Sequence, residues 1–170
     1  RGLGDVYKRQ ALALAEAGAK ITLVARSNDQ LESVAKQIRD SGGQASVHPA
    51  DLTKMEEIRK LEELEPFTIL VNNAGINRPQ SFEDVKENDF DDVLDLNVKS
   101  AFFVAQSVAR GMIQAGRGGS IINMSSQMGH VGGRNRSVYC ATKHAMEGFS
   151  KGMALDLSLI HISEPTRQPN

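Results

Sequence analysis

The chain has 170 residues, of which 40% are hydrophobic and 24% charged, a size and composition typical of one globular domain. Its formal net charge of -1 gives no basic surface for nucleic acid or anionic lipid, so neither partner is expected. Without a membrane-length apolar run or a signal peptide, and with Cys140 as its single cysteine, we expect a cytoplasmic protein with no metal site.

Apolar residues follow helical and strand-like spacings in turn along the chain. The helical stretches end at glycine or before proline, as at Gly18, at Gly42 and before Pro66. The longest stretch carries one apolar stripe from Phe90 to Met112. The spacing predicts strands over residues 20–25, 45–48, 67–71 and 120–124, and helices over residues 11–16, 31–38, 58–64, 90–114 and 137–157.

Strands and helices alternate throughout, which predicts an α/β fold with a parallel sheet covered by helices on both faces. Parallel neighbours need crossover connections, and both faces of such a sheet must be buried. Ligands bind beyond the carboxyl ends of these strands. Polar residues follow all four predicted strands, so we expect one crevice there, lined by Arg26, Asp51, Asn72-Asn73-Ala74-Gly75 and Ser125-Ser126.

Tyr139 and Lys143 are four residues apart in the last predicted helix, so both project from one face. An ammonium about 4 Å from a phenolate stabilises it by about 4 kcal/mol, enough to let a phenol exchange protons near neutrality. Such a pair alone is more often a surface contact. Ser126 precedes Tyr139 by thirteen residues across a glycine-containing loop, which can return it to the helix, although it could also simply end a strand before a solvated loop.

Asn97 falls on the apolar stripe of the long helix, where a buried amide needs hydrogen-bond partners. Nearby backbone could satisfy it, or it could mark a kink or polar relay facing the crevice; the stripe leaves both open. The segment Asn72-Asn73-Ala74-Gly75 could likewise be only the turn that ends a strand.

Together, Asn72-Asn73-Ala74-Gly75, Asn97, Ser126 and Tyr139-x-x-x-Lys143 resemble the short-chain dehydrogenase/reductase family in order and spacing. The resemblance covers about residues 11–158. It implies an incomplete Rossmann-type sheet and an enzyme that moves hydride between a nicotinamide cofactor and a carbonyl or alcohol. The chain is most similar in style to β-ketoacyl carrier-protein reductases and gluconate-type sugar-acid dehydrogenases. Side chains near the site fit a polar substrate or a solvated loop equally well: Gln127, His130, Arg134 and Arg136.

The resemblance also implies roles for four catalytic residues. Tyr139 would be the general acid/base, and Ser126 would hold the substrate oxygen. Lys143 would favour the phenolate and bind the nicotinamide ribose, while Asn97 would anchor a water chain that reaches the lysine. The implied cofactor-binding residues are Tyr139 and Lys143, Asn73, Ala74 and Gly75 along the cleft, and Asp51 and Leu52 beside the adenine.

Arg26 bears on the choice of cofactor. An acidic residue at this strand end would bind the ribose hydroxyls of NAD, whereas Ala25 here precedes a guanidinium suited to a 2′-phosphate. NADP(H) is therefore favoured and NAD(H) remains possible. Arg26 could also be only an exposed cation at a strand end.

Both ends of the chain look foreign to the family, over residues 1–10 and 159–170, and resemble translated sequencing adapters. Gly2 and Gly4 imitate the family's phosphate-binding turn, but no strand precedes them. We expect residues 1–10 to form neither a parallel strand nor a glycine cradle, so that neighbouring strand edges stay unpaired. This chain would then be an incomplete, inactive copy that binds NADPH weakly or not at all.

Two other readings concern assembly. Residues 90–114 and 137–157 resemble the helices through which the family dimerises, so a homo-oligomer is expected. A non-catalytic dinucleotide-binding or dimer-forming scaffold of the same fold is the alternative to an enzyme. Such a scaffold could dispense with Ser126, Tyr139 and Lys143, and their joint presence argues against it.

Overall fold

The computed structural model describes residues 3–158, with side chains from residue 8 onward. The chain forms two compact units, Arg1–Glu57 and Ile58–Asn170. No helix among the described residues is long and apolar enough to cross a membrane.

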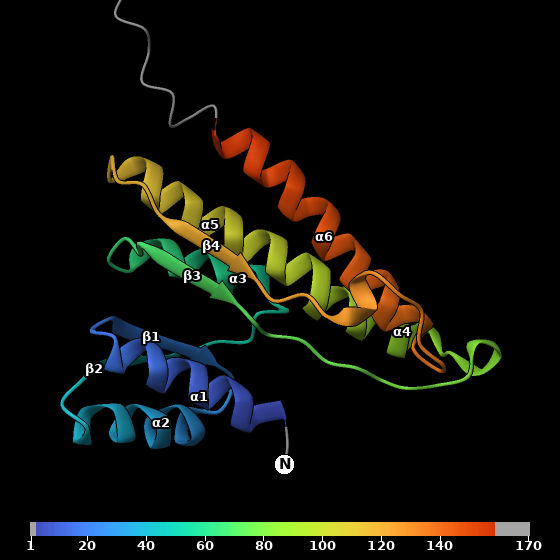
Figure 1. Cartoon of the computed structure of the whole chain (residues 1–170), viewed down its shortest axis with the longest axis horizontal. Coiled ribbons are helices and arrows are strands. Elements are labelled where there is room, and N and C mark those ends of the chain that lie inside the picture. Colours follow the sequence, from blue (N-terminus) through green and yellow to red (C-terminus); the bar gives the residue numbers. More distant parts are fainter. Residues whose placement is uncertain (1–2, 159–170) are drawn as a thin grey trace, which may run out of the picture. The chain divides into compact units, whose positions relative to one another are not determined.

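The first unit is a parallel strand pair accompanied by two helices (Figure 1). The strands pair from Lys20 opposite Gln44 to Ala25 opposite Pro49. Ser27 begins the second helix by accepting a hydrogen bond from the Gln30 amide at 3.5 Å. The elements are α1 (Leu3–Glu16), β1 (Lys20–Ala25), α2 (Asn28–Asp40) and β2 (Gln44–Pro49).

The second unit repeats the parallel arrangement, with Ile69 opposite Ser120 and Asn72 opposite Asn123. Two long helices lie next to each other beside this strand pair (Figure 1). Chain elements from the boundary onward are α3 (Met55–Arg59), a 3-10 turn η1 (Lys60–Glu63), β3 (Ile69–Asn72), η2 (Phe82–Asp84), α4 (Glu87–Leu94), the π-helical segment η3 (Asp95–Ser100), α5 (Ala101–Gln114), β4 (Ser120–Asn123), η4 (Gln127–Gly129) and α6 (Ser137–Ser158).

The core of the second unit lies where the apolar stripe predicts it. Val104, Val108 and Met112 of α5 are buried, together with Val93 of α4 and Met146 of α6. These side chains recur at helical spacing, so one face of each helix is removed from water. Their burial fixes α4, α5 and α6 around the end of the strand pair.

The structure confirms the strand–helix alternation and corrects three details. The predicted helix over residues 58–64 is α3 followed by the tighter turn η1, and the long helix is interrupted by η3. The expected single sheet is instead two separate pairs, β1–β2 and β3–β4, in the described part of the chain.

Residues 3–10 belong to α1 and supply no strand to either pair. The helix starts at Leu3, earlier than predicted, and Gly4 lies in its first turn. The prediction that residues 1–10 form no parallel strand is thus confirmed for residues 3–10, while Gly2 lies outside the described residues. Among described residues β1 pairs only with β2 and β3 only with β4, so the expected unpaired edges are confirmed.

Candidate functional site

The carboxyl end of the second strand pair is joined to both long helices by two asparagine side chains, of which Asn72 is buried and Asn123 is half-buried. The Asn72 amide donates to the Ala101 carbonyl at 2.6 Å and to Asn123 Oδ1 at 3.2 Å. The Asn123 amide in turn donates to Ser150 Oγ on α6 at 2.9 Å. The strand end therefore holds α5 and α6 in fixed positions.

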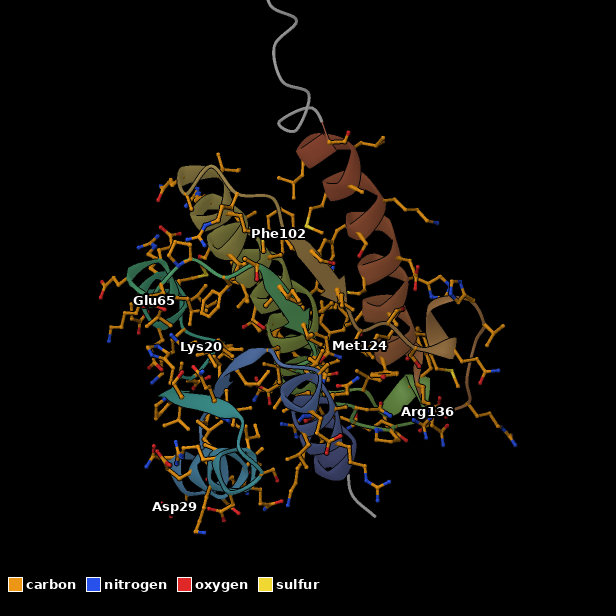
Figure 2. All side chains as sticks on the ribbon, turned by 60° about the vertical axis from the view of Figure 1, so that its left-hand side comes forward. Lys20, Asp29, Glu65, Phe102, Met124 and Arg136 are labelled. Carbon is orange, nitrogen blue, oxygen red and sulfur yellow. The ribbon has the colours of Figure 1, made fainter. Side chains whose placement is uncertain are left out.

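Lys143 crosses from α6 to the chain just beyond β4. Its Nζ donates to the carbonyl oxygen of Met124, labelled in Figure 2, at 2.7 Å. The same Nζ lies 5.7 Å from the centre of the Tyr139 ring, which confirms that the two side chains share a face. Only 6% of Lys143 is exposed, and this burial lowers its pKa from the ordinary 10.5. The site thus sets a desolvated amine beside a phenol.

Ser126 lies at the start of the turn η4, where its Oγ accepts a hydrogen bond from the Met128 amide at 3.2 Å. The preceding Ser125 hydroxyl donates to the Lys143 carbonyl at 3.5 Å. Gly129 is buried against the same carbonyl, and a Cβ there would lie 3.0 Å from this oxygen. Since a side chain would separate η4 from α6, this close approach requires glycine. The predicted return of the serine loop to the helix is confirmed.

Asn97 combines the two interpretations that the sequence leaves open. Its side chain is fully buried in the π-helical segment η3, an irregularity often found at functional sites. Its Oδ1 accepts from the Ile76 amide and its Nδ2 donates to the Ile76 carbonyl, both at 2.8 Å. A Cβ on Gly75 would lie 3.1 Å from Asn97 Oδ1. The amide is therefore satisfied by backbone and also marks a helix irregularity.

Thr142 is a site residue that the sequence reasoning misses. Its Oγ1 accepts from Asn97 Nδ2 at 3.2 Å and donates to the Tyr139 carbonyl at 2.8 Å. Its position, three residues after Tyr139 and directly before Lys143, could have indicated a site residue. Nothing in the local sequence, however, indicates that Asn97 is its partner.

The loop residues near this site are mostly exposed. Gln127 and Arg134 are exposed and Arg136 is half-buried. His130 Nε2 lies 3.5 Å from Glu147 Oε1 on α6. The Ser125 hydroxyl, with a smaller contribution from His130, lowers the pKa of Glu147.

After β3 the chain runs as an irregular segment through Asn73, Ala74 and Gly75, of which Ala74 is exposed. It is continued by a loop that α4 holds in place. Arg78 pairs with Asp89 at 3.2 Å and with Asp92 at 2.6 Å. Asn73 to Gly75 thus lie between Asn72, which anchors the strand, and the loop fixed by Arg78.

The first unit carries the other predicted cofactor residues at its own strand ends. Arg26 follows β1 and is exposed, without an ion pair among the described residues. Asp51 follows β2, where its Oδ1 accepts from the Thr53 hydroxyl at 2.8 Å and the Thr53 amide at 3.1 Å. These bonds lower the pKa of Asp51, to which Arg26 adds a smaller effect. Leu52 is half-buried.

No cluster of His, Cys, Asp or Glu able to hold a metal ion is found among residues 3–158. Cys140 is unpaired and half-buried.

Similarity to named proteins agrees with this geometry. Gluconate 5-dehydrogenase of Gluconobacter oxydans is 36% identical over 161 residues, covering 92% of this chain and 61% of that protein. The 3-oxoacyl-[acyl-carrier-protein] reductase of Staphylococcus epidermidis is 34% identical over 164 residues, covering 93% of this chain and 66% of that protein. The chain therefore spans about three fifths of the length of the gluconate relative.

Solved structures share the fold. A metagenomic short-chain oxidoreductase in complex with NADP superimposes with a TM-score of 0.84 at 28% identity, over 90% of this chain and 72% of that one. An NAD+-bound xylitol dehydrogenase gives 0.86 at 30% identity, over 92% and 62%. These matches confirm the α/β, Rossmann-like class. The family model described as short chain dehydrogenase matches residues 1–163. The chain belongs to the short-chain dehydrogenase family.

Proposed function

We propose that this protein transfers hydride between a nicotinamide cofactor and a carbonyl or alcohol substrate. The observation that carries the proposal is that Tyr139, Lys143 and the serine-containing segment after β4 come together at the start of α6. Tyr139 and Lys143 share a face, and the serine strand end packs against the Lys143 carbonyl. A non-catalytic scaffold would not need this combination.

Tyr139 would give a proton to the substrate oxygen in reduction and take it back in oxidation. A positioned acid/base group of this kind contributes about 10²–10⁴-fold to rate. The Ser126 hydroxyl accepts from Met128 with a lone pair, so its own proton is available to hold that oxygen. Lys143 supplies a nearby amine that favours the phenolate when protonated. Asn97 would anchor a water chain reaching the lysine.

The residues present fit a nicotinamide dinucleotide, which when bound supplies or accepts the hydride. Lys143 Nζ donates to one backbone carbonyl and, as an ammonium with three donors, has protons left for ribose hydroxyls. Gly75 has no side chain, so the backbone there can lie directly against Asn97 Oδ1. In the second unit Asn73, Ala74 and Gly75 would line the cofactor cleft; in the first, Asp51 and Leu52 would lie beside the adenine.

NADP(H) is the favoured cofactor, with NAD(H) the alternative. Arg26 is exposed and uncommitted to an ion pair in the described chain, so its guanidinium can bind a 2′-phosphate bidentately. The comparison proteins include one with NADP and one with NAD+, so the family alone does not decide between the two cofactors. Arg26 is the residue that favours NADP(H) in this proposal.

For the substrate we propose a keto sugar acid or a β-ketoacyl thioester, following the gluconate and acyl-carrier-protein relatives. The test is to incubate a form of the enzyme that spans the full length of its relatives with NADPH and either 5-ketogluconate or an acetoacetyl thioester, and to follow absorbance at the nicotinamide band. Oxidation of NADPH that depends on one of the two substrates identifies the substrate class. Absence of oxidation with both would contradict the proposed activity.

We also propose a homo-oligomer formed through helices 90–114 and 137–157. A groove of about 320 Å³ runs between α5 and α6, lined largely by apolar side chains. Phe102, labelled in Figure 2, is 44% exposed and lies edge-on to Phe149 with ring centres 5.8 Å apart. Exposed aromatic surface of this kind is typical of interfaces. Light scattering should show a dimer or larger assembly that Phe102→Glu dissociates; a parent that stays monomeric at high concentration contradicts it.

The cellular location that we propose is the cytoplasm. A single cysteine in 170 residues fits a reducing compartment. A nicotinamide-dependent reductase would also find its cofactor there. Fractionation of the producing cell tests the assignment, and recovery outside the cytosolic fraction would overturn it.

A further inference from the structure

The hydrogen bonds around Thr142 have fixed directions. The Thr142 hydroxyl has one proton, which it donates to the Tyr139 carbonyl at 2.8 Å. Toward Asn97 it can therefore only accept. The bond of 3.2 Å must come from Asn97 Nδ2, and both side chains are fully buried.

This direction determines which way the Asn97 amide faces. Rotating the amide by half a turn would set its oxygen against the hydroxyl lone pair and its NH2 group against the Ile76 amide proton. Both contacts would be mismatched in a place that water does not reach, and an unmet buried polar group costs about 1–3 kcal/mol. The Ile76 backbone and the Thr142 hydroxyl thus favour the same orientation, in which Asn97 Oδ1 accepts from Ile76 and Nδ2 donates both to the Ile76 carbonyl and to Thr142.

We propose that Thr142 is a positioning residue that helps to fix the Asn97 amide and ties the start of α6 to η3. Its importance for catalysis rests on the function proposed above, because the start of α6 carries Tyr139 and Lys143. A threonine that only bonds its own helix carbonyl is common. Thr142 differs because the same oxygen also receives a donor 45 residues earlier in the chain. The hydroxyl thus joins the catalytic helix to the segment that anchors Ile76.

Two substitutions separate the hydroxyl from the shape of the side chain. Thr142→Val keeps a branched side chain of similar size and removes the hydroxyl, whereas Thr142→Ser keeps the hydroxyl and removes the methyl group. If the valine variant does not fold, Thr142→Ala against Thr142→Ser gives the same comparison.

The first measurement does not depend on activity. Proton–nitrogen NMR of the 170-residue protein follows the side-chain NH2 of Asn97, assigned by its loss in Asn97→Ala. We expect both NH2 signals to shift in Thr142→Val and to exchange with water about tenfold faster, since one buried bond is lost. Thr142→Ser should stay close to the parent. Unchanged signals and exchange within twofold in the valine variant would overturn the proposal.

The second measurement concerns catalysis. In a form of the enzyme that spans the full length of its relatives, with NADPH and an accepted substrate, Thr142→Val should lower kcat about tenfold while KM for the cofactor stays within twofold, and Thr142→Ser should keep kcat near that of the parent. Equal kcat in both variants would remove the catalytic part of the proposal. If the parent transfers no hydride but the NMR contrast holds, the proposed function fails and the positioning of Asn97 by Thr142 stands.

Discussion

The strand ends of the two units hold their polar side chains in different ways. In the second unit, Lys143 and Asn97 are buried and reach partners 19 and 21 residues away in the chain. In the first unit, Asp51 is bonded to Thr53, two residues away. Arg26, in the same unit, is exposed.

Because of this difference, the polar groups of the two units suit different roles. Groups that are cross-linked through the core cannot move without breaking buried hydrogen bonds, which suits chemistry that depends on fixed geometry. An exposed cation at a strand end can be replaced by another residue without disturbing the fold. Such a position suits a side chain that distinguishes one ligand from another. Substitutions in the second unit should therefore change rate or stability, and those in the first should change preference.

In a form of the enzyme that spans the full length of its relatives, replacing Tyr139 by phenylalanine should have the largest effect on rate. The change removes only the hydroxyl, so turnover should fall by about 10²–10⁴-fold while thermal unfolding shifts little. Steady-state assays with circular dichroism as the folding control measure both. Turnover within twofold of the parent would show that Tyr139 is not the proton donor.

Removing Asn97 should have the largest effect on stability. Asn97→Ala leaves the Ile76 amide and carbonyl without their partner and the Thr142 oxygen without its donor. The free energy of unfolding should fall by about 2–4 kcal/mol. Thr53→Ala in the first unit is the matched control, because its bonds to Asp51 are exposed, and should cost under about 1 kcal/mol. Equal losses in urea denaturation would remove the contrast between the units.

Arg26→Ala should change cofactor preference without changing stability. Loss of a charge-assisted contact to a 2′-phosphate should weaken NADPH binding about tenfold and leave NADH binding unaltered. Arg39→Ala is the control, since Arg39 is already paired with Glu32 at 2.7 Å. Calorimetric titration also tests whether this chain binds NADPH weakly, as residues 1–10 led us to expect. Tighter NADH binding in the parent would contradict the assignment of Arg26.

The smallest predicted effect is a pH dependence caused by Lys143. Burial lowers its folded-state pKa from the unfolded value of 10.5, so the unfolded state binds more protons in the alkaline range between the two values. Stability relative to Lys143→Met should therefore rise with pH through that window and level off above about 10.5. Denaturation curves of both proteins at several alkaline pH values measure the difference. A difference that does not change with pH would show a solvated amine, and one that falls with pH would show an ion-paired amine; either result would contradict the lowered pKa.

The sequence by itself determined the α/β class and the strand and helix order, and it supplied the residues that we propose for the site. Hydrophobic periodicity, glycine and proline stops and the spacing of Tyr139 and Lys143 all act within one or two turns of chain, so they can be read locally. The return of Ser126 to α6 could be expected because glycines lie in the loop between them.

Only the tertiary structure decided how those residues are held. The π-helical segment at Asn97, the carbonyl that receives Lys143 Nζ and the link through Thr142 all depend on partners 19 to 45 residues apart. The pairing of β1 with β2 and of β3 with β4, and the helical state of residues 3–10, also come from the structure. Buried polar groups take whichever partner the packing brings within about 3 Å. Local sequence patterns therefore do not indicate which partner a buried polar group will have.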